Sequence, residues 1–129
     1  MILKSFEINK IDQNTTHLIL FYGKNEGLKN EALDVLIKDK INFLNYEEKD
    51  ILNNEDNFIE NILSRSLFDP HKFVIIKRAT DKILKIIEIL HLKNLEDTTI
   101  ILNSENLEKK SKLRSFFEKD KALVCVPFY

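Results

Sequence analysis

The sequence predicts one α/β domain over residues 1–129, built on a five-stranded parallel sheet with helices on both faces. Short apolar runs alternate with segments of helical periodicity along the whole chain, which is typical of right-handed strand–helix–strand crossovers. Two of these runs, 73–77 and 98–103, are almost continuously apolar, as strands covered on both faces are. With 43% apolar and 32% charged residues, the composition is that of a globular domain.

The first half of the chain alternates strands with two long helices. Strands are expected over 17–22 and 41–46, with a further short edge strand over 2–8. Apolar residues at helical spacing predict helices over 26–37 and 56–67. The apolar face of the first helix is assigned to Leu28, Ala32, Val35 and Leu36. That of the second is assigned to Ile59, Leu63 and Leu67, flanked by Phe58 and Ile62, with Pro70 ending the helix.

The second half repeats the alternation. After the strand over 73–77, Thr80 can cap a helix whose apolar residues are Ile83, Ile86, Ile87 and Leu90. The strand over 98–103 is followed by a helix over 108–118, which packs through Leu113, Phe116 and Phe117. A last strand is expected over 122–127.

The first strand runs directly into a glycine loop, where a phosphate-binding loop would carry G-x-x-x-x-G-K-[S/T]. Counted from Gly23, the second glycine position holds Leu28, the lysine position Lys29 and the hydroxyl position Asn30. Leu28 places a Cβ where the backbone would approach a phosphate, and Asn30 lacks the hydroxyl that binds magnesium. Gly23, Gly27 and Lys29 therefore outline a degenerate phosphate loop.

The residues that nucleotide hydrolysis requires at the strand ends are also missing. Carboxylates there would hold magnesium and polarise water. The run that ends at Ile76 is instead followed by Lys77-Arg78-Ala79, and the run that ends at Leu102 by Asn103-Ser104. We therefore expect no catalytic residue, no metal and no cofactor in this chain.

The remaining reactive side chains do not form a recognisable site. The three histidines, His17, His71 and His91, have no spacing typical of a metal site or a catalytic triad. Cys125 is the only cysteine, which excludes an internal disulfide, and its apolar surroundings predict an inert core thiol. The N-terminus lacks a signal peptide, and no apolar run approaches the ~20 residues that span a bilayer. These features indicate a cytoplasmic protein with no membrane partner.

Two surface features carry functional hypotheses. Leu67 and Phe68 are adjacent near the end of a helix, so they either complete the core or stand out as an apolar anchor for a partner. The basic residues of the last helix are either a solvated face or a phosphate-contact patch for DNA. They are Lys109, Lys110, Lys112 and Arg114.

Five segments, in their order and spacing, resemble the N-terminal domain of the delta subunit of the bacterial DNA polymerase III clamp loader. Together they extend over essentially the whole chain. They are Leu20-Phe-Tyr-Gly-Lys-Asn-Glu-Gly-Leu-Lys29, Ser66-Leu-Phe-Asp-Pro70, Lys72-Phe-Val-Ile-Ile-Lys-Arg-Ala-Thr-Asp81, Leu107-Glu-Lys-Lys-Ser-Lys-Leu-Arg-Ser-Phe-Phe-Glu118 and Val126-Pro-Phe-Tyr129.

The resemblance implies an AAA+-like fold that has lost its ATP site. The chain would then be a non-catalytic subunit of the DNA polymerase III holoenzyme, a DNA-directed DNA polymerase. It would bind the ring-shaped sliding clamp, the beta subunit, and promote its opening for loading onto primed DNA during replication, while sister subunits hydrolyse ATP. By resemblance, Leu67 and Phe68 would be the hydrophobic plug that enters a pocket of the clamp.

The chain departs from the family in two respects. Clamp-binding segments often read Q-L-[S/D]-L-F, whereas residues 64–68 read Ser-Arg-Ser-Leu-Phe and match only the last three positions. Family members also continue beyond the position of Tyr129 into a lid and an oligomerising collar. We therefore expect a fragment of a longer chain, whose missing C-terminal region contacts the clamp-loader ATPase subunits and delta-prime.

Two other functions stay open from the sequence. One is a small P-loop NTPase or nucleotide kinase with an atypical phosphate loop, for which ATP binding would depend on Lys29. The other is an α/β nucleic-acid-binding module that uses the basic helix, for which binding would depend on salt and not on Leu67 or Phe68.

Overall fold

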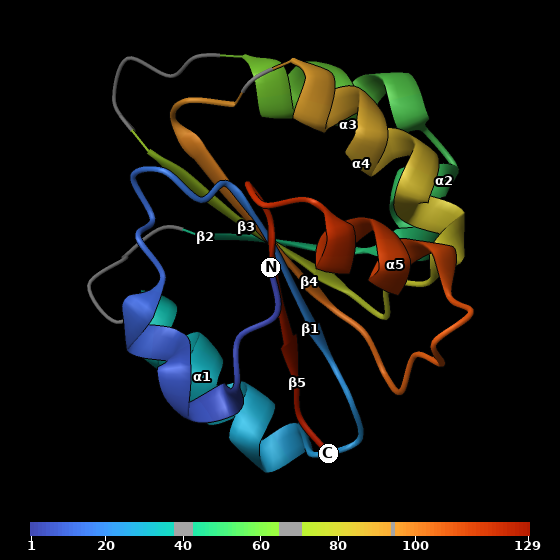
Figure 1. Ribbon diagram of the computed structural model, residues 1–129. Coiled ribbons are helices and arrows are strands. Elements are labelled where there is room, and N and C mark those ends of the chain that lie inside the picture. Colours follow the sequence, from blue (N-terminus) through green and yellow to red (C-terminus); the bar gives the residue numbers. More distant parts are fainter. Residues whose placement is uncertain (38–42, 65–70, 94) are drawn as a thin grey trace.

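The computed structural model describes residues 1–37, 43–64, 71–93 and 95–129 (Figure 1). Its five strands form one parallel sheet with the order β2-β3-β4-β1-β5, which confirms the predicted five-stranded parallel sheet. Strand β4 has the predicted bounds, and β1, β3 and β5 begin within two residues of their predicted starts. The strands are β1 (Leu18–Tyr22), β2 (Phe43–Glu47), β3 (Lys72–Lys77), β4 (Thr98–Asn103) and β5 (Val124–Pro127).

Helices cover both faces of the sheet, as predicted (Figure 1). Helix α1 (Glu26–Ile37) and the 3-10 helix η1 (Ser5–Lys10) lie on one face. The other face carries α2 (Glu48–Leu52), α3 (Glu55–Leu63), the 3-10 turn η2 (Asp81–Ile83), α4 (Leu84–Leu92) and α5 (Lys112–Lys119). Alternate residues of β1 enter the two cores: Leu18, Leu20 and Tyr22 face α2–α5, whereas Ile19 and Phe21 face α1.

The edge strand predicted over 2–8 is wrong. Only Ile2 forms a β-bridge, which pairs it with Cys125 beside β5. The chain then turns into η1, where the side chain of Glu7 accepts a hydrogen bond from the amide of Lys4 at 3.0 Å. The amide of Glu7 in turn donates to the carbonyl of Lys4 at 2.8 Å, so these backbone groups are satisfied within the segment and need no strand partner.

Helix α1 has the predicted bounds, and Ala32 and Leu36 are buried as predicted, but the rest of its buried face differs from the prediction. Leu28 and Val35 are 41% and 52% exposed, and the buried positions are Lys29, Ala32, Leu33 and Leu36. Hydropathy places a lysine outside, because a buried ammonium is costly unless it is paired and hydrogen-bonded. Lys29 is buried because its partners are supplied by its own helix and by the end of β4.

Helix α3 ends at Leu63, so the prediction that it extends to 67 and is stopped by Pro70 is wrong. Ser64 is already extended, and Leu63 is 39% exposed, while Phe58 and Ile62 face the core. The end of the helix is stabilised by Lys72, whose Nζ donates to the carbonyl of Asn61 at 2.8 Å. A cation at this position satisfies carbonyl groups that have no partner within the helix.

Helix α5 begins at Lys112, four residues later than predicted. Ser111 caps it, with its Oγ accepting a hydrogen bond from the amide of Arg114 at 3.2 Å. Thr80 caps η2 in the predicted manner, because its hydroxyl accepts from the amide of Lys82 at 3.2 Å. Across the described ranges, none of the helices has the length and apolar character needed to span a membrane.

Candidate functional site

The glycine loop between β1 and α1 is closely packed against the C-terminal segment. Gly23 has a φ of +123°, and its amide donates to the carbonyl of Glu105 at 3.1 Å. A Cβ on Gly23 would lie 2.0 Å from the carbonyl oxygen of Phe128, so only glycine fits there. At Gly27 the nearest atom to such a Cβ would be Asn25 Oδ1 at 3.7 Å, which is an ordinary contact.

Several amides that a phosphate loop would present to its ligand are bound within the chain. The amide of Asn25 donates to the carbonyl of Phe128 at 3.1 Å. The side chain of Asn25 caps α1, since its Oδ1 accepts from the amide of Leu28 at 3.1 Å. A phosphate at a helix N-terminus needs these same donors. In this loop they are occupied by an asparagine side chain and by the backbone next to Tyr129.

Lys29, at the lysine position of the loop pattern, is held inside the protein. Its side chain is 1% exposed, and its Nζ donates to the carbonyl of Ser104 at 3.0 Å. It also forms an ion pair with Glu26 at 2.8 Å. Lys29 thus ties the first turn of α1 to the residue that follows β4.

The ends of the neighbouring strands carry no carboxylate pair. Strand β3 ends in Lys77, followed by Arg78, whose φ of 55° is left-handed and whose guanidinium pairs with Glu47. Strand β4 ends in Asn103, followed by Ser104. In the part of the chain that the structure describes, no three His, Cys, Asp or Glu side chains gather as metal ligands would.

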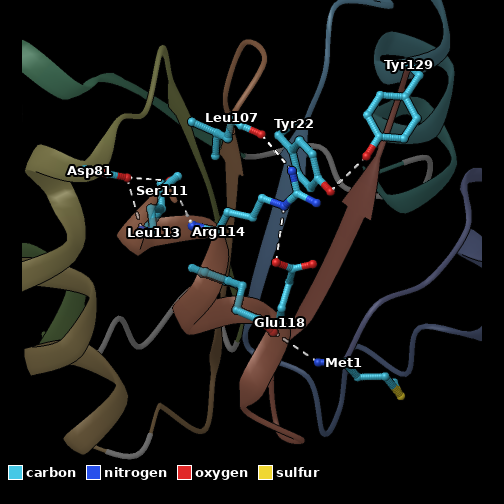
Figure 2. Close-up of polar contacts among 10 residues, drawn as sticks. Met1, Tyr22, Asp81, Leu107, Ser111, Leu113, Arg114, Glu118 and Tyr129 are labelled. Atoms are coloured by element: carbon cyan, nitrogen blue, oxygen red, sulfur yellow. Dashed lines mark hydrogen bonds and ion pairs between the residues drawn. The ribbon is translucent and has the colours of Figure 1, made fainter. Parts of the chain in front are cut away.

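The acidic residue that follows β3, Asp81, is bound to the N-terminus of α5 (Figure 2). Its carboxylate accepts from Ser111 Oγ at 2.6 Å and from the amides of Leu113 and Lys112 at 3.1 and 3.2 Å. Partial burial alone would raise the pKa of Asp81, but these hydrogen bonds outweigh it and hold that pKa below its usual range. The anion position at this helix N-terminus is therefore occupied by the protein itself.

Arg114, one of the four basic residues assigned to DNA, lies within the fold instead (Figure 2). Its Nε donates to Glu118 at 3.2 Å, and a second nitrogen donates to the carbonyl of Leu107 at 2.9 Å. The guanidinium also lies 4.8 Å from the ring centre of Tyr22, and the side chain is only 12% exposed. These contacts assign Arg114 to structure and remove it from the basic surface.

Lys109, Lys110 and Lys112 are exposed, and among contacts within the described residues only Lys110 forms an ion pair, with Glu108 at 3.3 Å. An exposed pair of this kind contributes little to stability. Lys82, Lys110 and Lys112 line an open groove of about 520 Å³. These three lysines define the basic groove, which is lined by residues that follow the carboxyl ends of β3 and β4. Lys109 is adjacent to it in the sequence.

Leu67 and Phe68 lie outside the described residues, so their proposed role stays a prediction. The residues that flank this segment are described and are in contact. Lys72 Nζ lies 3.2 Å from Ser64 Oγ and also donates to the carbonyl of Ser64. The two ends of the segment are therefore held together by one lysine.

Two further contacts could not be inferred from the sequence. Tyr22 and Tyr129 meet through their hydroxyls at 3.4 Å, and burial, followed by this hydrogen bond, raises the pKa of Tyr22 above its usual range. Lys29 and Ser104 meet although 75 residues separate them. The spacing of these residues in the sequence predicts neither contact, because each contact depends on which strands lie beside β1.

These features define an α/β domain whose glycine loop and loop lysine are bound internally. No family model matches the sequence, and none of the curated proteins matches it. Among solved structures, the fold is similar to the Bacillus subtilis DNA clamp loader delta protein (YqeN), with a TM-score of 0.70 and 16% sequence identity. The alignment covers 96% of this chain and 42% of that one, so the chain spans about two fifths of that protein's length. At this identity the likeness is one of fold.

Proposed function

We propose that this chain is the clamp-binding domain of a delta-like subunit of a bacterial replicative clamp loader and hydrolyses no ATP. The observation that carries the proposal is the fold, which follows a clamp loader delta protein over 96% of the chain. The internal bonds of Lys29 and of the loop amides agree with a subunit that leaves ATP hydrolysis to others.

In this proposal, Leu67 and Phe68 enter an apolar pocket on the sliding clamp. Side chains of this kind act as anchors when a partner buries them fully. The domain promotes opening of the ring only if it binds the opened clamp more tightly than the closed one. The segment precedes β3 directly, so clamp binding takes place at the edge of the sheet where β3 begins.

The test is calorimetry of this chain with the sliding clamp of the same organism, in EDTA and without nucleotide. We expect binding, and we expect Leu67→Ala/Phe68→Ala to weaken it by roughly 2 kcal/mol or more per anchor. The matched control is Phe6→Ala/Leu92→Ala, which removes the same two residue types from positions that are 78% and 83% exposed. Unchanged affinity in the first variant, or a complete lack of clamp binding by the folded chain, would contradict the proposal.

ATP titration tests the rival P-loop function in the same instrument. Binding that is lost in Lys29→Ala would favour a nucleotide-binding enzyme over a clamp-binding domain. We expect no such binding, because a triphosphate would have to displace Ser104 and Glu26 from the ammonium group of Lys29.

A second function, contact with the DNA backbone, is favoured by the basic groove. Lys82, Lys110 and Lys112 are exposed there, Lys109 is exposed beside Lys110 in the sequence, and all four would release counterions on binding phosphates. The variant Lys109→Ala/Lys110→Ala/Lys112→Ala should lower the slope of log K against log salt by roughly one per lost phosphate contact. Lys93→Ala, at an exposed position on another helix end, is the control. An unchanged slope in the triple variant would exclude this surface.

A further inference from the structure

A cleft of about 550 Å³ lies between α1 and the part of the sheet formed by β2, β3 and β4. It exists because one long helix crosses this face of a five-stranded sheet, and the side chains of β2 toward the edge are exposed. The cleft includes residues at the carboxyl ends of β3 and β4, where parallel α/β sheets bind their ligands. Its volume is in the range of small-molecule sites.

Three asparagine side chains line the cleft, one from a helix and two from strands. Asn30 comes from α1, Asn45 from β2 and Asn103 from β4. Within the described ranges, none of these three amide groups makes a hydrogen bond through its side chain. A primary amide offers a donor and an acceptor side by side, which is the pattern that reads the edge of a nucleobase.

The cleft also has apolar walls. Phe43, on the edge strand, is 38% exposed, and Ile75 of β3 lies opposite Asn45, two residues further along. Leu33 and Ile37 of α1 form the other side. An aromatic ring with aliphatic neighbours provides a stacking surface for a flat heterocycle.

The charges around the cleft balance. Lys29, Lys77 and Arg78 are matched by Glu26, Asp34 and Glu105. Lys29 is already paired with Glu26, and Arg78 with Glu47. The cleft therefore offers no excess positive charge for a triphosphate, and the ligand that it suits is an uncharged polar molecule.

One buried hydroxyl at the cleft has no partner. Ser104 is 1% exposed, and its Oγ makes no hydrogen bond within the described residues. A buried polar group without a partner costs free energy, and this Oγ lies beneath the lining of the cleft and not at its surface. The carbonyl of Ser104 also accepts a hydrogen bond from Lys29. Ser104 therefore connects the end of β4 to helix α1 beside the cleft.

We propose that this cleft binds a nucleoside-type heterocycle, stacked against Phe43 and hydrogen-bonded at its edge by the amide of Asn45, two residues along the same strand face, while Asn30 and Asn103 line the remainder of the cleft. The base can come as a free nucleoside or as an unpaired base of a single strand, because both present the same ring and edge. The site shares Lys29 and Asn30 with the degenerate loop pattern but does not use the loop amides, which are bound to Phe128 and Asn25. The proposal stands independently of clamp binding.

The test is a titration of the ¹⁵N-labelled chain, followed by amide chemical shifts, with adenosine, guanosine, cytidine, thymidine, ATP and a short single-stranded oligonucleotide. We expect at least one nucleoside to bind with a Kd below about 1 mM and to shift the amides of residues 43–47, 77 and 103. Its affinity should be no weaker than that of the matching triphosphate. If a free nucleoside saturates the site, the ligand is a free nucleoside. If only the oligonucleotide binds tightly, the ligand is an unpaired base of a single strand.

Variants separate the cleft from incidental contacts. Asn45→Leu lies on an exposed edge position and should weaken binding at least tenfold, whereas Asn57→Leu on α3, outside the cleft, should leave it unchanged. The proposal is overturned if no base-bearing probe shifts these amides in the folded chain. It is also overturned if ATP binds far more tightly than every nucleoside, or if Asn45→Leu binds as the wild type does. None of these outcomes alters the clamp-binding test.

Discussion

Lys72, the first residue of β3, donates a hydrogen bond from its Nζ to the carbonyl of Asn61 at 2.8 Å and thereby caps α3. The same ammonium bonds to Ser64, so one side chain joins both ends of the segment that carries Leu67 and Phe68. The cation compensates the partial negative charge at the end of a helix. Lys72 therefore links the stability of α3 to the position of the proposed clamp-binding segment.

Replacing Lys72 with methionine should destabilise the chain by about 1 kcal/mol, because the apolar stem is kept and only the charged hydrogen bonds are lost. Urea unfolding followed by circular dichroism measures the effect. Lys72→Arg keeps the charge and should recover at least half of the loss. Equal stability of wild type and Lys72→Met would show that the cap contributes nothing.

Gly23→Ala should destabilise the chain by at least about 2 kcal/mol, since φ is positive and the new Cβ would collide with the backbone of Phe128. Gly27→Ala is the matched control. It lies in the first turn of α1 with free space around it, and should be neutral or stabilising by up to ~1 kcal/mol. Thermal unfolding of the two variants side by side decides the point, and similar melting temperatures would contradict it.

Arg114→Met should cost about 2 kcal/mol, because it removes hydrogen bonds to Glu118 and Leu107 and the contact with the ring of Tyr22. Lys112→Met, two residues earlier and exposed, should change stability by less than about 0.5 kcal/mol. Chemical denaturation distinguishes the two. If Lys112→Met proved the more damaging, the assignment of Arg114 to structure would be wrong.

The free energy of unfolding should decrease as the pH is lowered, partly because of Asp81. Its pKa is lower in the folded chain than in the unfolded one, so its contribution is complete above the unfolded pKa of about 4 and is lost as the pH falls through the folded pKa. Unfolding free energies measured from about pH 2.5 to pH 7 should therefore show a shallower acid loss in Asp81→Asn. That variant should also be less stable at pH 7. If Asp81→Asn lost stability at low pH as steeply as the wild type, other carboxylates would be responsible for that loss.

The sheet could be predicted because its strands are short apolar runs between turns, and Thr98–Asn103 was predicted with its full bounds. The buried side of α1 was predicted only in part: Ala32 and Leu36 are buried, but Lys29 and Leu33 are buried in place of Leu28 and Val35. It depends on Lys29 reaching Ser104, and nothing local indicates a buried lysine. Likewise, the end of α3 is set by Lys72 from the next strand and not by Pro70.

The candidate site was predictable only in part. The pattern located the loop at Gly23, because strand–glycine–helix order is local information. That the loop amides are bound by Phe128 required the position of β5 beside β1, which brings residues a hundred positions apart into contact. Arg114 was grouped with its lysine neighbours because charge is visible in a sequence, whereas its contact with Tyr22 is not.

All strands of the sheet point the same way, so the place where one begins is separated from the place where its neighbour ends by the length of a strand. The proposed clamp-binding segment precedes the start of β3, while the basic groove and the asparagine-lined cleft include residues at the ends of β3 and β4. Six residues at about 3.3 Å each make this a rigid spacer of roughly 20 Å. A sliding clamp bound where β3 begins and a polynucleotide bound where β3 and β4 end would not compete for space, and the domain would set the distance between them.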